Sequence, residues 1–228
     1  MLSRRLHKWL ALLVGVQLVI WAVSGFYMVA VHIDIIHGDM LVQPVEAPLA
    51  GGLDQVLSPA DILSARPDAH SLNLFMRGQR PVYLVASEQG DAVLDARSGE
   101  PLPALTGDEA AAIARRYFSG DAPVRSTTLV ERDPPSEIAP FPLPLWRVDF
   151  DDRWGTSFYI APDSGRFVTR RHTLWRVFDF LWMLHIMDYE AREDINNSLL
   201  RILSSLALLL GLTGSWLVYL RFAAGRSR

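Results

Sequence analysis

WLALLVGVQLVIWAVSGFYMVAV, residues 9–31, is a run of 23 residues without a charge. As a helix rising about 1.5 Å per residue it is about 35 Å long, enough to cross a bilayer. A second run, ILSSLALLLGLTGSWLVYL, covers residues 202–220 and is 19 residues long, or about 29 Å as a helix. Neither run shows the polar stripe that buried soluble helices usually carry. The sequence therefore predicts two membrane-spanning helices that enclose residues 32–201.

Charge is distributed unevenly along the chain, and this predicts an orientation. All 25 acidic residues lie between Asp34 and Asp194, and the segment 32–201 holds 16 Arg against them, a formal charge of −9. Six basic residues lie at the two ends: Arg4, Arg5, Lys8, Arg221, Arg226 and Arg228. Short basic ends favour a cytoplasmic location for both termini. The middle of the chain is then expected in the periplasm of a Gram-negative cell.

Other classes of protein fit the composition poorly. The first apolar run is too long for a signal-peptide core and no A-x-A site follows it, so we interpret it as a retained anchor. Cys is absent, which excludes disulfides, thiolate metal sites and Cys nucleophiles. No basic patch for nucleic acid is present. No G-x-S-x-G, H-E-x-x-H or P-loop pattern occurs, so no catalytic residue is predicted.

The middle segment contains two similar halves. Ser58-Pro59 starts a short helical pattern, and Thr106 starts a second one that runs to about residue 118. Each helix is followed by strand-like runs, at 71–77, 81–87 and 92–96 in the first half and at 124–131, 146–150, 157–160 and 167–169 in the second. The hairpins 92–99 and 158–165 can be overlaid. The sequence predicts an α+β fold in which a helix plus an antiparallel sheet is repeated.

Short motifs give the chain a family resemblance. The hairpin VLDARSG at 93–99 resembles the PepSY domain, and RRLHKW at 4–9, Ser24-Gly25, WMLH at 182–185 and GLTG at 211–214 resemble PepSY-associated transmembrane proteins. The resemblance implies a tandem PepSY-like periplasmic domain anchored by two helices. Larger members of the family have four or more spans. Ala161 stands where the second hairpin should have Asp, so we expect a different turn there.

The predicted organisation has five parts. Residues 1–32 form the cytoplasmic N-terminus and the first span, and 198–228 form the second span and the cytoplasmic C-terminus. The PepSY-like units are expected at 41–104 and 105–171. Residues 172–197 are expected to hold an amphipathic aromatic helix that lies at the outer membrane interface before the second span.

His185 is the most informative polar residue of that aromatic helix. Helical geometry places it opposite Arg176 and Asp179. Asp188 follows at i+3, where its carboxylate could accept the imidazole N–H, the support that a metal-ligating His needs. The alternative is a His185–Asp188 pair that only joins the helix to its neighbours.

His32 and His37 are predicted at the same membrane face as His185. His7 lies about 37 Å from His32 along the first helix and cannot share its ligand. Haem iron accepts two imidazoles, and the resemblance includes haem-containing reductases of ferric-siderophore uptake. We therefore consider haem b, with His185, His32, His37 and Asp188 as cofactor-binding candidates and His185 and His32 as metal ligands. The alternative is that His7, His32 and His37 are interfacial side chains that only place polar tips among headgroups. His70 and His172 are interpreted as solvated.

Partners follow from the same features. The bilayer is one partner, and Ala207, Gly211 and Ser215 form a small-residue stripe that could serve a homodimer or, as slightly favoured, pack on the first span. Gln17 needs a polar partner, for which Ser204 or Thr213 is expected. The functions considered are a redox or haem-bearing accessory subunit linked to iron reduction, a non-catalytic periplasmic binding or regulatory module, and a small structural subunit of a membrane complex.

Overall fold

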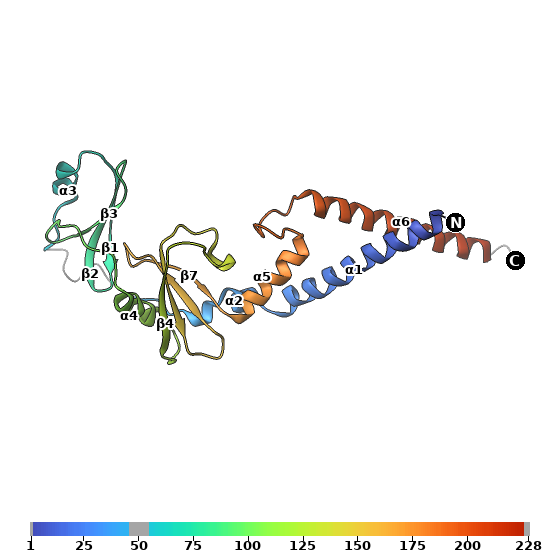
Figure 1. The fold of residues 1–228 in the computed structure, drawn as a ribbon, viewed down its shortest axis with the longest axis horizontal. Coiled ribbons are helices and arrows are strands. Elements are labelled where there is room, and N and C mark those ends of the chain that lie inside the picture. Colours follow the sequence, from blue (N-terminus) through green and yellow to red (C-terminus); the bar gives the residue numbers. More distant parts are fainter. Residues whose placement is uncertain (1, 46–54, 226–228) are drawn as a thin grey trace. The chain divides into compact units, whose positions relative to one another are not determined.

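A computed structural model describes residues 2–45 and 55–225 (Figure 1). Arg226 and Arg228 of the expected cytoplasmic tail, and residues 46–54 of the expected first PepSY-like unit, lie outside these ranges. The chain forms two compact units. We call Met1–Ile36 with Arg176–Arg228 the helical unit, and His37–Trp175 the sheet unit.

The helical unit contains the two long apolar helices, α1 (Leu2–Ala30) and α6 (Ser198–Gly225). Ala11–Ala30 and Ser198–Ala223 are each long and apolar enough to cross a membrane, as the sequence predicts. Val14, Gln17 and Ser24 are buried, and their spacing places them with Trp21 on one face of α1. Helix α2 (Ile33–His37) follows α1, and α5 (Thr173–Ile186) precedes α6.

The small-residue stripe of α6 is exposed over most of its length. Gly211 and Ser215 are exposed, and a Cβ added to Gly211 would meet no atom within 4 Å. The expectation that the stripe packs on the first span is therefore wrong at these two residues. Asn197, by contrast, caps α6 as expected, because its Oδ1 accepts a hydrogen bond from the Leu200 N–H at 2.9 Å.

The first lobe of the sheet unit, residues 55–103, is a helix followed by three antiparallel strands. Ser58 caps helix α3 by accepting the Asp61 N–H. The sheet order is β1-β2-β3, and its core contains Ile62, Tyr83, Val85, Leu94 and Ala96. The elements are α3 (Pro59–Ala65), β1 (Ala69–Arg77), β2 (Arg80–Ser87) and β3 (Ala92–Asp95).

The second lobe, residues 104–175, is a helix followed by four antiparallel strands in the order β4-β5-β6-β7. Thr106 and Glu109 form a capping box at the start of the helix. The core between helix and sheet is aromatic, with Phe118, Phe150 and Phe158 almost fully buried. The elements are α4 (Gly107–Tyr117), β4 (Val124–Val130), β5 (Leu145–Phe150), β6 (Ser157–Ile160) and β7 (Phe167–Arg171). Figure 1 shows α4 beside this sheet.

A loop covers the other face of the second sheet. Ile138 and Phe141, from a proline-rich segment that includes the 3-10 helix η3 (Ser136–Ile138), pack on Leu145, Tyr159 and Ala161. Beside this cluster, the buried Asp149 carboxylate accepts hydrogen bonds from Arg147 Nε (2.9 Å), Ser157 Oγ (2.6 Å) and Ser126 Oγ (3.2 Å). The second lobe therefore has two covered faces.

The two lobes share a hydrogen-bond pattern. In the first hairpin the Asp95 N–H donates to the Glu100 carbonyl and the Gly99 N–H to the Asp95 carbonyl; in the second, Ala161 donates to Arg166 and Gly165 to Ala161. In each lobe the residue before the helix cap donates its backbone N–H to a carbonyl at the corresponding position of the hairpin. Leu57 donates to the Ala96 carbonyl, and Leu105 donates to the Pro162 carbonyl. The expectation of a different second turn is wrong. The backbone holds the turn, and a left-handed glycine completes it, φ 73° at Gly99 and 70° at Gly165.

The chain reaches the first lobe by way of the second. Residues 37–43, which we call the strap, include the 3-10 helix η1 (Asp39–Leu41). The Gln43 N–H donates to the Tyr117 carbonyl at 2.8 Å, and the Ser119 N–H donates to the Leu41 carbonyl at 3.0 Å. Residues 41–43, expected in the first PepSY-like unit, thus lie on the end of α4 in the second lobe.

Candidate functional site

Helix α5 ends at Ile186, within the helical unit, because Met187 adopts a left-handed conformation with φ 58°. The following loop is organised by Asp188. Its carboxylate accepts the backbone N–H groups of Glu190, Ala191, Glu193 and Asp194 at 3.0–3.3 Å. These bonds, those from Asp194 and Glu193 first, lower the pKa of Asp188. Asp188 therefore fixes the loop between α5 and α6.

The last carbonyls of a helix lack partners within the helix. In α5 three consecutive ones accept hydrogen bonds from side chains outside it. Gln17 Nε2 lies 3.4 Å from the Leu184 oxygen, Trp21 Nε1 2.7 Å from the His185 oxygen, and Asn197 Nδ2 2.8 Å from the Ile186 oxygen. We call Gln17, Trp21 and Asn197 the carbonyl clamp. The expectation that Gln17 pairs with Ser204 or Thr213 is wrong, because the helix end offers it a backbone acceptor.

The His185 side chain packs against α1 within the same unit. Its Nδ1 lies 2.7 Å from Ser24 Oγ, and Ser24 is fully buried. Gly25 lies beside the imidazole, since a Cβ there would make an ordinary contact with His185 Cε1 at 3.8 Å. The Trp182 ring stacks nearly parallel to the imidazole, with centroids 6.5 Å apart. The Ser24-Gly25 and WMLH motifs of the sequence therefore meet at this contact.

The hydrogen bonds of Ser24 assign the imidazole tautomer. Ser24 Oγ lies 2.7 Å from the Ile20 carbonyl oxygen. A serine inside a helix commonly donates its hydroxyl proton to the carbonyl of the residue four positions earlier. Its single proton is then directed to Ile20, so Oγ accepts from His185 Nδ1–H. This leaves the lone pair on Nε2. A neutral imidazole with Nδ1–H held by a hydrogen bond is the form that binds a metal through Nε2.

The remaining predicted site residues have other partners. His32 is exposed, and its Nδ1 lies 3.3 Å from Asp34 Oδ2. It lies two residues after Ala30, the last residue of α1, whereas His185 contacts α1 at Ser24, eight residues before His32 in the sequence. The Asp188 carboxylate is directed to the loop backbone, while His185 Nδ1 is directed to Ser24. His37 belongs to the sheet unit.

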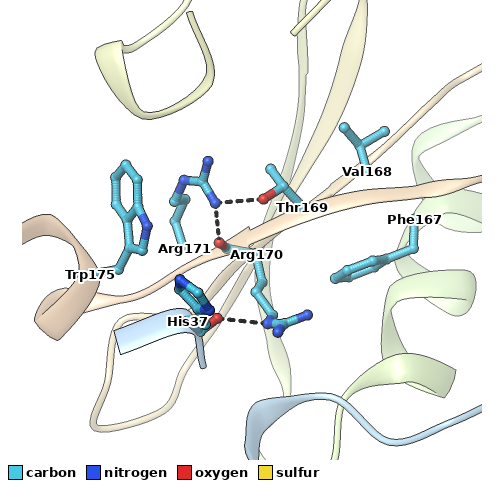
Figure 2. A pocket seen from close by; sticks show the side chains of 7 residues that line it. All are labelled: His37, Phe167, Val168, Thr169, Arg170, Arg171 and Trp175. Carbon is cyan, nitrogen blue, oxygen red and sulfur yellow. Dashed lines mark hydrogen bonds between the residues drawn. The ribbon is translucent and has the colours of Figure 1, made fainter. Parts of the chain in front are cut away.

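His37 lines a pocket of about 230 Å³ in the sheet unit, together with the residues of β7 and Trp175 (Figure 2). Its carbonyl accepts the Arg170 Nε–H at 2.8 Å, and Arg170 also pairs with Asp39. Arg171 donates to the Thr169 hydroxyl and, at 2.7 Å, to the Arg170 carbonyl. Its guanidinium lies over the Trp175 ring, 4.0 Å from the centroid. The pocket therefore gathers cationic and aromatic side chains.

His172, expected to be solvated, is fully buried. Gly38 of the strap explains this, because a Cβ there would lie 2.9 Å from His172 Cδ2. The strap covers the imidazole. The two residues are 134 positions apart, so the local sequence does not predict this contact. His70 is exposed on β1, as expected.

A second pocket, of about 220 Å³, lies between the two lobes. Arg77 and Arg80 line it, with Glu109 and a floor that includes Leu105 and Ile113. Arg77 Nη2 donates to the Pro103 carbonyl at 2.9 Å. Its Nη1 is buried and makes no hydrogen bond to the residues that the structure describes.

Sequence reasoning singled out His185, Gln17 and Ser24-Gly25 but did not predict that they meet. Gln17, Trp21 and Ser24 recur at intervals of four and three along α1. This spacing places three polar groups on one helix face and was the signal available. Their acceptors are mostly backbone carbonyls. Every residue carries a backbone carbonyl, so the sequence does not show which residue accepts.

Two apolar helices of spanning length and an α+β sheet unit define the class as a membrane protein with an α+β domain. The chain belongs to the PepSY-associated TM region family, whose pattern it matches over residues 4–228. Comparison with curated proteins and with solved structures gave no significant match.

Proposed function

We propose that the chain is anchored in a bacterial inner membrane with both termini in the cytoplasm, and that its two lobes are tandem PepSY-like units in the periplasm. The basic ends and the acidic middle support this orientation. The shared hairpin and helix-cap hydrogen bonds of the two lobes support the repeat. In this arrangement the last turn of α5 lies beside Gln17 and Trp21, within the first span.

The function that the site supports best is that of a redox or haem-bearing accessory subunit, linked to iron or siderophore reduction. The observation that carries it is the Nδ1–H of His185 on Ser24, which leaves Nε2 as a ligand atom. A b-type haem held there would supply one-electron transfer. His185 is the described residue that would hold such a haem, with Trp182 and Trp21 as aromatic neighbours. A second ligand from another chain is consistent with an accessory role.

The test is an ultraviolet–visible spectrum of the full-length protein, purified in mild detergent from haem-replete cells, before and after dithionite. We expect a reduced-minus-oxidised cytochrome b spectrum that His185→Ala abolishes. His70→Ala removes an exposed histidine of β1 and is the matched control, which should keep the spectrum. A flat wild-type spectrum, or one that survives His185→Ala, contradicts the proposal.

Ser24→Ala gives a second readout that does not remove the ligand. The imidazole then loses its hydrogen-bond acceptor, which makes Nε2 a weaker donor. The spectrum should remain while the midpoint potential rises. An unchanged potential would show that Ser24 has only a packing role.

The second candidate is a non-catalytic binding or regulatory module. Arg77 favours it, because a buried guanidinium nitrogen without a hydrogen bond lies beside an apolar-floored pocket. A carboxylate attached to an apolar group, such as a peptide C-terminus, matches this lining. Calorimetric binding of a leucine-rich tripeptide with a free C-terminal carboxylate, absent for its amide and for Arg77→Met, is the expected result. Equal binding of acid and amide would exclude it.

A further inference from the structure

We propose that the pocket between β7 and the start of α5 binds the phosphate of an anionic phospholipid headgroup. This goes beyond the proposed function, since it involves neither His185 nor the helical unit. The pocket is the space of about 230 Å³ lined by His37, Phe167, Val168, Thr169, Arg170, Arg171 and Trp175 (Figure 2).

The size of the pocket suits a headgroup. The volume accommodates a phosphodiester with part of its glycerol, but not an acyl chain. Acyl chains would have to stay outside, as they do for a lipid that remains in its bilayer.

The donors of the lining suit a phosphate. Arg170 and Arg171 are cations, and Thr169 and Trp175 carry an O–H and an N–H. None of the seven lining residues is acidic. Asp39, the acidic partner of Arg170, belongs to the strap and lies outside the lining.

Both guanidinium groups are held in place before any ligand arrives. Arg170 Nε donates to the His37 carbonyl and its Nη2 pairs with Asp39, whereas its Nη1 makes no hydrogen bond to the residues that the structure describes. Arg171 is fixed by the Arg170 and Glu137 carbonyls and by the Trp175 ring. Fixed donors lose little entropy on binding a planar or tetrahedral oxyanion.

The chain itself keeps the pocket near the membrane surface. His37 follows Ala30, the last residue of α1, by seven residues, which span at most about 25 Å. Phosphates of the headgroup layer are therefore concentrated within reach of the pocket. Trp and Arg are also the side chains that favour this interfacial layer. This proximity favours a lipid phosphate over free phosphate.

The test is native mass spectrometry of the full-length protein released from detergent with added phosphatidylglycerol, phosphatidylcholine or inorganic phosphate. We expect retained phosphatidylglycerol, and about tenfold weaker retention in Arg170→Gln, since a charge-assisted hydrogen bond is lost. Arg125→Gln removes the same charge from an exposed position of β4 and should retain the lipid as the wild type does.

Three outcomes would overturn the proposal. Equal retention by Arg170→Gln and wild type would place the lipid elsewhere. Equal retention of phosphatidylcholine would show that the protein does not select an anionic headgroup. Binding of inorganic phosphate without phosphatidylglycerol would assign the pocket to a soluble anion. Trp175→Phe keeps an aromatic ring beneath Arg171 but removes the indole N–H. We expect this variant to retain the lipid more weakly than the wild type.

Discussion

Each lobe has a helix, a hairpin turn and a backbone hydrogen bond that joins the helix start to the hairpin. The two lobes nevertheless bury different groups. The first lobe places its three strands against α3 around an aliphatic core with Tyr83. The second adds β7 and a proline-rich loop, which covers the other face of its sheet. A second covered face makes room for buried polar groups such as Asp149 and Glu137. The added strand also supplies the cationic pocket.

This difference explains the departure at Ala161. Its counterpart Asp95 lies at a partly exposed turn, where its carboxylate accepts the Arg97 N–H at 2.8 Å. Ala161 instead packs in the cluster of Ile138, Leu145 and Tyr159. A carboxylate there would be buried among apolar side chains, so the additional layer disfavours the aspartate that the first lobe uses.

The largest expected effect comes from the aromatic core. Phe158→Ala should destabilise the second lobe by about 4 kcal/mol, because it leaves a cavity beside Phe118, Phe150 and Phe167. Hydrogen exchange of the full-length protein in detergent should show faster exchange in β5 and β6 and unchanged exchange in β2. Leu94→Ala is the control with the opposite pattern. Loss of protection in both lobes from either change would show one cooperative unit.

The substitution that makes the lobes more alike should be harmful. Ala161→Asp restores the hairpin aspartate but buries it, which should destabilise the second lobe by about 3 kcal/mol. Ala161→Ser, a smaller polar change at the same position, should cost less. Hydrogen exchange of the full-length protein in detergent, followed in β5 and β6 with β2 as the reference, reports on this lobe. A stabilised Ala161→Asp protein would refute the explanation given for the departure.

Acid should weaken the second lobe selectively. Burial raises the pKa of Asp149, but hydrogen bonds from Ser157 and Arg147 outweigh it, and the net pKa is lowered from its ordinary 3.8. A lowered folded-state pKa stabilises the fold above the ordinary value, and this contribution is lost as the pH falls through the folded value. Below about pH 4, β5 should therefore lose protection before β2, which contains no carboxylate.

Asp149→Asn separates this effect from general acid unfolding. It should cost about 2 kcal/mol at pH 7, because charge-assisted hydrogen bonds are lost, and it should flatten the dependence of second-lobe stability on pH below 4. The same steep dependence in Asp149→Asn and wild type would assign the acid sensitivity to other carboxylates.

The smallest expected effects are at the helix caps, where the lobes should agree. Thr106→Ala and Ser58→Ala each remove one side-chain acceptor from a helix start. Each should destabilise its own lobe by about 1 kcal/mol, measured by hydrogen exchange in α4 and α3. The corresponding Thr106→Ser change keeps the acceptor and should be nearly silent. A cap effect that spreads to the other lobe would argue against separate caps.

Periodicity and turn chemistry predicted much of the fold, but not the contacts that hold the site. The two apolar helices, the helix caps at Ser58, Thr106 and Asn197, and the strands follow from local pattern. The burial of His172 depends on a strap from far away in the sequence. The clamp depends on backbone carbonyls at a helix end, and Ser24 rather than Asp188 supports His185 because α1 brings a hydroxyl to Nδ1. The proposed ligand role of His185 stays a prediction.

The carbonyl clamp has a consequence for biosynthesis. Two of its donors, Gln17 and Trp21, are made among the first residues of the chain, and Asn197 is made only after α5 is complete. Unpaired carbonyls are disfavoured in a lipid environment. The carbonyls at the end of α5 can therefore all be paired only after the chain has been made through Asn197, at the start of α6. A chain truncated before Asn197 would present an unfinished helix end to the quality-control machinery of the cell.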